Sequence, residues 1–229
     1  LLKLSKFTIK VQELDSGRPP ARRKRADKTN KTNMTYTTNT TNLILPHGGY
    51  KNLESYKTAI IISDGTAYFC RKWLKDLKLS SQMDGAARSG KQCLVEGSLN
   101  SGTSKKLELK LVGNARGSYG ELLEDFEDFL RQRGLALWAK DSPEAQAVRR
   151  LAYKSNKSYA TYKTYIENQD AKIAANTLIC LIHQENYLLD QLLRALEKTF
   201  TEQGGFTERL YNARSEHMSN KTHKTNRTY

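Results

Sequence analysis

The strongest constraint on the fold is that apolar residues recur at helical spacing over nearly all of residues 53–204. Apolar positions three and four residues apart mark one face of an α-helix, whereas a half-buried strand alternates every second residue. The spacing predicts helices over residues 53–77, 80–100, 103–134 and 170–204. Only four prolines occur in 229 residues, so few positions interrupt a helix.

The predicted helices differ in the width of their apolar faces. The first and last have wide faces, and the inward stripe of the first is expected to hold Tyr56, Ile60, Ser63, Ala67, Cys70, Leu74 and Leu77. The stripe of 80–100 is built from small side chains, namely Met83, Ala86, Gly90, Cys93 and Gly97. A glycine inside a helix costs about 1 kcal/mol relative to alanine, so two of them indicate close approach of a neighbouring helix.

Residues 134–169 have a different pattern and are predicted to form a helical insert. Asp141-Ser142-Pro143-Glu144 is typical of an N-cap followed by proline at the first helical position. We expect a short helix to about residue 152, a loop, one further short helix, and a brief terminal helix over 206–217 that packs back. Four long helices with short connections predict an all-α, antiparallel up-down four-helix bundle over 43–217. Its wide apolar faces indicate a homo-oligomer or another partner.

The formal net charge of +14 lies mostly outside the predicted bundle. Residues 1–33 carry +7, residues 218–229 carry +3, and the rest of the chain carries +4. The segments 1–42 and 218–229 are predicted to be disordered tails, because their low-complexity composition offers too few apolar groups to offset chain entropy. Met34 lies shortly before the bundle, which gives the hypothesis that the native chain starts there.

Several short motifs of the predicted bundle resemble a known family. Val95-Glu96-Gly97, followed by Asn114-Ala115-Arg116-Gly117-Ser118 and then Glu121, is similar to the "AEG … A-x-GS-x-x-E" pattern, with valine in place of the first alanine. That pattern belongs to four-helix-bundle proteins, which include the rRNA intervening-sequence proteins and the accessory variability determinant (Avd) of diversity-generating retroelements. The segments 45–50, 87–92 and 179–184 look like a variant with a C-terminal "four helix bundle suffix" region, and the resemblance covers about residues 43–217.

The resemblance implies a small bacterial bundle that assembles as a pentameric ring with a basic surface. It also implies a non-enzymatic partner of a reverse transcriptase and of RNA or DNA. The motif residues that carry it are Gly90, Glu96, Gly97, Gly117, Ser118 and Glu121. Glu96 and Glu121 are interpreted as structural groups that accept hydrogen bonds or pair with Arg88 or Arg116.

Two groups of basic residues are candidates for contact with nucleic acid, because Lys and Arg neutralise phosphate charge and release counterions. The first brackets the turn near residue 102 and comprises Arg88, Lys91, Lys105, Lys106, Lys110 and Arg116. The second lies in the insert and comprises Lys154, Lys157, Tyr159, Tyr162 and Lys163, where aromatic rings could stack on unpaired bases. The alternatives are a solvated basic surface for the first group and helix packing for the tyrosines. A protein–protein scaffold with no role in nucleic-acid binding is the alternative function.

The sequence offers little support for an enzyme. Residues 85–92 nearly form a nucleotide-binding P-loop, but Gln92 replaces the Ser or Thr that binds magnesium, and the segment follows a helix instead of a strand. Three scattered cysteines and four histidines give no metal-site spacing. We therefore expect a non-enzymatic, cytoplasmic protein without metal, cofactor, small-molecule substrate or membrane span.

Overall fold

The computed structural model describes residues 43–154 and 156–225, with side chains up to residue 220. These residues form helices without strands, so the predicted all-α class is confirmed. The predicted tail 1–42 and the hypothesis about Met34 lie outside the described residues. Helix α7 continues through Thr225, whereas residues 218–225 were predicted to belong to a disordered tail.

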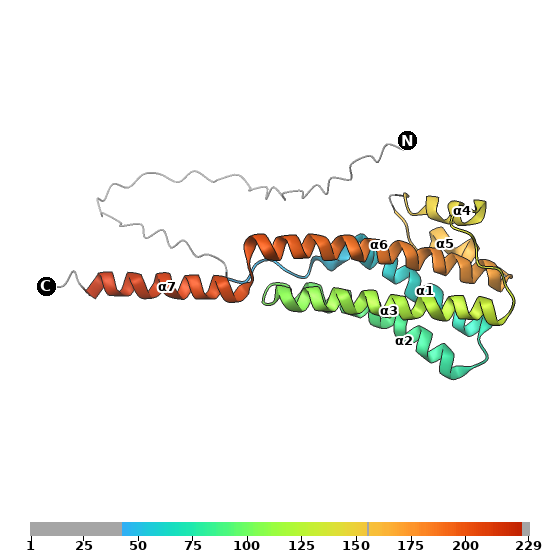
Figure 1. Cartoon of the computed structure of the whole chain (residues 1–229), viewed down its shortest axis with the longest axis horizontal. Coiled ribbons are helices and arrows are strands. Elements are labelled where there is room, and N and C mark those ends of the chain that lie inside the picture. Colours follow the sequence, from blue (N-terminus) through green and yellow to red (C-terminus); the bar gives the residue numbers. More distant parts are fainter. Residues whose placement is uncertain (1–42, 155, 226–229) are drawn as a thin grey trace, which may run out of the picture. The chain divides into compact units, whose positions relative to one another are not determined.

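Four long helices pack on one another and are called the core helices here (Figure 1). They are α1 (Glu54–Trp73), α2 (Leu77–Asn100), α3 (Lys105–Gln132) and α6 (Ala171–Gln203). Helices α1 and α3 each pack against both α2 and α6. Short connections follow α1 and α2, and a short 3-10 helix, η1 (Gly49–Asn52), precedes α1.

The helix starts follow from local capping chemistry. Asp76, Ser104 and Asp170 accept hydrogen bonds from backbone N–H groups in the first turns of α2, α3 and α6. Such caps satisfy donors that have no partner within the helix. The Asp76 cap starts α2 at Leu77, three residues before the start that the apolar spacing predicted.

The insert contains two short helices, as predicted. Helix α4 (Pro143–Leu151) begins after Ser142, whose hydroxyl accepts a hydrogen bond from the backbone N–H of Ala145. Helix α5 (Tyr159–Ile166) packs against α1 and α6. The last helix, α7 (Phe206–Thr225), begins after two glycines. Within the described part of the chain it does not pack along another helix, so the expectation that it packs back was wrong.

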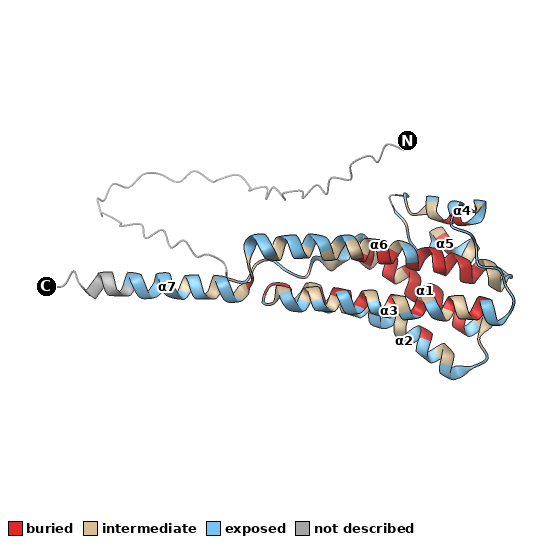
Figure 2. Cartoon of the chain, viewed as in Figure 1, coloured by how far each residue is buried: buried red, intermediate tan, exposed pale blue. Residues whose placement is uncertain are grey.

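The apolar core is concentrated in one part of the core helices (Figure 2). Helix α6 buries twelve residues between Ala174 and Leu189, and none after Leu189. At 1.5 Å per residue, α1 is about 30 Å long and α6 about 50 Å, so α1 cannot cover the whole of α6. The C-terminal part of α6 therefore keeps leucines such as Leu192 and Leu196 half-buried.

Candidate nucleic-acid interface

The first two turns of α3 carry three of the predicted basic residues. Lys105 is partly buried and its Nζ lies 2.9 Å from Oε2 of Glu108, so its charge is neutralised locally. Lys106 and Lys110 are exposed, and no described carboxylate lies within ion-pair distance of either. Because they are four residues apart, they share one face of α3. These two cations are therefore exposed members of the predicted set near the α2–α3 turn.

The other predicted cations of α2 and α3 point to different neighbours. The Lys91 Nζ donates a hydrogen bond to Oγ of Ser63 on α1, at 3.2 Å. The Arg116 Nε donates to Oδ1 of Asp190 on α6, also at 3.2 Å. Arg88 is exposed and has no ion-pair partner in the described region. The six residues therefore do not form one continuous patch.

Charge is segregated along α3. Its first half, residues 105–116, holds Lys105, Lys106, Lys110 and Arg116 against a single acid. Residues 121–128, in its second half, hold five acids and no base: Glu121, Glu124, Asp125, Glu127 and Asp128. The carboxyl of Asp125 has a raised pKa, caused by burial and by the neighbouring charges of Asp128 and Glu121. A polyanion is therefore favoured over the first half of α3 and repelled from the second.

Arg194 is an exposed cation that the sequence pattern did not indicate as a candidate. It lies one turn beyond Asp190 on α6, so it shares the face from which Asp190 reaches Arg116 on α3. Arg194 is exposed, and none of the described carboxylates pairs with it. Figure 1 places this part of α6 beside the first half of α3. The nearness of Arg194 to α3 is visible only once α3 and α6 are packed together, because the two helices are far apart in sequence.

The insert residues divide into packed and exposed groups. Tyr162 is fully buried and its pKa is raised to about 12 by burial, so its ring offers no face to a base. The Tyr159 hydroxyl donates to Oε1 of Glu167 at 3.1 Å, and Lys157 pairs with Glu54 at 3.1 Å with its side chain 10% exposed. The two tyrosines therefore match the packing alternative. Lys154 and Lys163 are exposed and remain accessible to solvent.

The glycine motif residues have a clear packing role at Gly90. A Cβ placed there would lie 2.6 Å from Cζ of Tyr119, whose ring is fully buried on α3. A Cβ at Gly97 would lie 3.4 Å from Cβ of Leu111, which is an ordinary contact distance, and one at Gly117 would meet no described atom within 4 Å. The predicted close approach of α2 and α3 is therefore present and is tightest at Gly90.

The polar motif residues behave differently from the expectation. The Ser118 hydroxyl donates to Oγ of Ser89 across α2 and α3, at 3.2 Å. Glu96 and Glu121 are both exposed, and neither forms an ion pair within the described chain. The predicted pairing with Arg88 or Arg116 is therefore wrong: the helix register directs Arg116 to Asp190 instead.

A group of polar side chains is buried among the core helices. Glu185 on α6 is fully buried, and neither of its carboxyl oxygens has a hydrogen-bond partner in the described chain. The hydroxyl of Tyr119 and Oδ1 of Asn186 are also buried without partners there. Burial raises the pKa of Glu185 well above its usual value, and the Lys157 ammonium offsets this only in part. Burial, and then the nearby Glu185, raise the pKa of Tyr119.

Other reactive groups fit a structural role. Burial raises the pKa of all three thiols, that of Cys70 to about 11, so little thiolate forms near neutral pH. In the described chain, no three His, Cys, Asp or Glu residues gather closely enough to hold a metal ion. None of the described helices combines the length and apolar character that a membrane span requires.

Comparison of the chain with models of protein families, with curated proteins and with solved structures found no match. The family resemblance therefore rests on the motif residues themselves. Among these, Gly90 and Ser118 have defined contacts between α2 and α3.

Proposed function

We propose that this chain is a non-enzymatic protein that binds nucleic acid through the basic first half of α3. The observation that carries the proposal is the separation of charge on that helix, with Lys106 and Lys110 exposed and unpaired within the described region. Phosphate contacts by such cations are independent of sequence and weaken as salt displaces them. Arg194 of α6, on the face that carries Asp190, is a further exposed cation beside the Arg116–Asp190 pair.

We further propose that the core helices form an antiparallel up-down four-helix bundle that assembles with other copies of itself, as a pentamer by the family resemblance. The support is the half-buried apolar surface near the C-terminal part of α6, together with exposed Leu99 and Leu107. Repetition around a ring would multiply weak phosphate contacts into useful affinity. The same apolar surface favours the alternative of a protein–protein scaffold. If light scattering gave the mass of a monomer at micromolar concentration, self-assembly would be ruled out.

The test compares two variants of the full chain that lose the same charge. Lys106→Gln/Lys110→Gln removes the exposed cations of α3, whereas Lys75→Gln/Lys78→Gln removes two exposed cations near the start of α2. Binding to duplex DNA and to single-stranded RNA is measured between about 50 and 200 mM salt. Each lost phosphate contact reduces the magnitude of the negative slope of log K against log salt by about 0.9 on duplex DNA and about 0.7 on single strands.

The proposal predicts that the α3 pair lowers the affinity. It also predicts that the salt slope becomes less steep, by about 1.8 on duplex DNA if each lysine meets one phosphate. The α2 pair should leave both nearly unchanged. Equal effects of the two pairs would show that overall charge, including that of the terminal segments, drives binding. A chain that binds neither polymer at the lowest salt would favour the scaffold function.

A further inference from the structure

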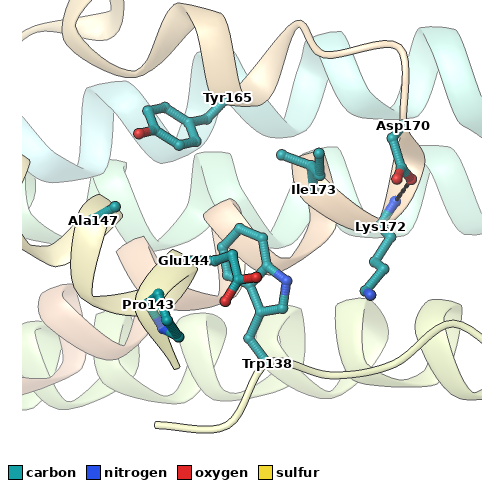
Figure 3. A pocket seen from close by; sticks show the side chains of 8 residues that line it. All are labelled: Trp138, Pro143, Glu144, Ala147, Tyr165, Asp170, Lys172 and Ile173. Carbon is teal, nitrogen blue, oxygen red and sulfur yellow. Dashed lines mark hydrogen bonds between the residues drawn. The ribbon is translucent and has the colours of Figure 1, made fainter. Parts of the chain in front are cut away.

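A pocket lies where the insert meets the N-terminal part of α6 (Figure 3). Its volume is about 490 Å³, which falls in the range of small-molecule sites. Trp138 and Tyr165 supply aromatic surface, and the remaining lining residues are Pro143, Glu144, Ala147, Asp170, Lys172 and Ile173. None of the residues predicted from sequence as binding residues lines this pocket.

The wall that carries Trp138 is held in place by a buried amide. The side chain of Asn176 is 1% exposed, and its Oδ1 accepts a hydrogen bond from the backbone N–H of Trp138 at 2.7 Å. Its Nδ2 donates to the carbonyl oxygens of Ala136 and Lys172, at 3.1 and 2.9 Å. In addition, Nη1 of Arg149 on α4 donates to the Lys140 carbonyl at 2.7 Å. The loop between α3 and α4 is thus tied to both α6 and α4, so the pocket is formed before any ligand arrives.

The charges around the pocket are unequal. Glu144 and Asp170 contribute two carboxylates and Lys172 contributes one ammonium. One oxygen of Asp170 accepts a hydrogen bond from the backbone N–H of Lys172, and Glu144 has no partner in the described chain. Figure 3 shows Glu144 on α4 and Lys172 on α6, and Glu144 lines the pocket together with Trp138. A cation is therefore favoured on the α4 side, where the lining includes a carboxylate and an indole ring.

We propose that this pocket binds a small organic cation, with its ammonium group near Glu144 and its apolar body against Trp138, Tyr165 and Ile173. Aromatic faces attract cations through the ring quadrupole, and a nearby carboxylate adds to that attraction. An inorganic cation would leave the aromatic and aliphatic surface unused, and an anion would meet an excess of negative charge. The molecule is a ligand here and undergoes no reaction.

The test uses 2-phenylethylammonium as the probe, with 2-phenylethanol and phenylacetate as its neutral and anionic counterparts. Calorimetry on the full chain gives the dissociation constants. Fluorescence in a Trp73→Phe background reports on Trp138, because the chain has only these two tryptophans. We expect a Kd on the order of 1 mM for the amine, binding about fivefold weaker for the alcohol, and no binding of the acid.

Two variants test the assignment of the charges in opposite directions. Glu144→Gln should weaken amine binding about threefold, whereas Lys172→Gln should strengthen it about twofold, because the first removes attraction and the second removes repulsion. Glu197→Gln, an exposed carboxylate elsewhere on α6, is the matched control and should change nothing. Absence of saturable amine binding, equal binding of the alcohol, or shifts of the same sign in the two variants would each overturn the proposal.

Discussion

The buried carboxyl of Glu185 predicts an unusual pH dependence of stability. Its side chain is fully buried and has no hydrogen-bond partner in the described chain, so the ionised form is disfavoured and its pKa is raised well above the usual value. In the unfolded chain the same group titrates near 4.3. The folded protein therefore keeps a proton that the unfolded chain releases as the pH rises.

The sign and size of the effect follow from proton linkage. The contribution of Glu185 to stability is fully present below its unfolded pKa and is lost as the pH rises to its folded pKa. Between the two pKa values the free energy of unfolding falls by about 1.4 kcal/mol for each pH unit. Above the folded pKa the loss is complete and no longer depends on pH.

The variant Glu185→Gln removes the titration and keeps the shape and polarity of the side chain. Wild type and variant are unfolded in urea at half-unit steps from pH 4 to 8. The variant should match wild type within about 1 kcal/mol near pH 4, since both side chains are then neutral and polar. It should become the more stable protein as the pH rises toward the folded pKa of Glu185, by about 1.4 kcal/mol per unit.

The difference between the two proteins isolates Glu185 from every other group, because the shared titrations cancel. Glu197→Gln, an exposed carboxylate on the same helix, serves as the control and should show no such trend. A constant difference between wild type and Glu185→Gln over the whole range would refute the reasoning. It would mean that the carboxyl is hydrated or paired in the folded protein.

Further substitutions test the packing. Gly90→Ala should destabilise the fold by about 1–3 kcal/mol in thermal unfolding, because its Cβ would press on the Tyr119 ring. Gly85→Ala, in open space on the same helix, should instead stabilise it by up to about 1 kcal/mol. Asn176→Ala removes two hydrogen bonds to the α3–α4 loop and one within α6, and should cost about 1–3 kcal/mol, with faster backbone amide exchange at Trp138. Cys70 should resist alkylation at pH 8 until the protein unfolds, because it is buried and its pKa is about 11.

The sequence predicted the helices well because their signals are local. Apolar spacing, the Ser142-Pro143 cap and the paired glycines of α2 all act within a few residues of chain. It was harder to predict which residues of α1 face the core. The expected stripe put Ile60 and Ala67 inside, with Ile61 and Ile62 widening the apolar face. The structure buries Ile61, Ile62 and Thr66 more fully than Ile60 and Ala67. Consecutive isoleucines and buried threonines blur the contrast between polar and apolar faces on which the prediction depends.

The candidate interface was harder to predict than the fold because its members depend on distant partners. Lys91 meets a serine 28 residues away, and Arg116 meets an aspartate 74 residues away. Spacing along the chain cannot identify partners that are this far apart in sequence. The prediction therefore placed six cations in one group, whereas in the structure they do not form one continuous patch. The hydrogen bond that holds the α3–α4 loop also joins residues that are distant in sequence, because Asn176 lies 38 residues from Trp138.

The location of the core determines whether a substitution at the basic surface can change nucleic-acid binding without changing stability. The buried residues of α6 end at Leu189, and Lys106 and Lys110 lie exposed in the first turns of α3, where Val112 is the first buried residue. Exposed substitutions that break no ion pair usually change stability by less than about 0.5 kcal/mol. The Lys106→Gln/Lys110→Gln variant should therefore keep the unfolding midpoint of wild type while losing affinity for nucleic acid. A variant that lost both together would show that these lysines support the fold, and the basic surface would then need to be sought elsewhere.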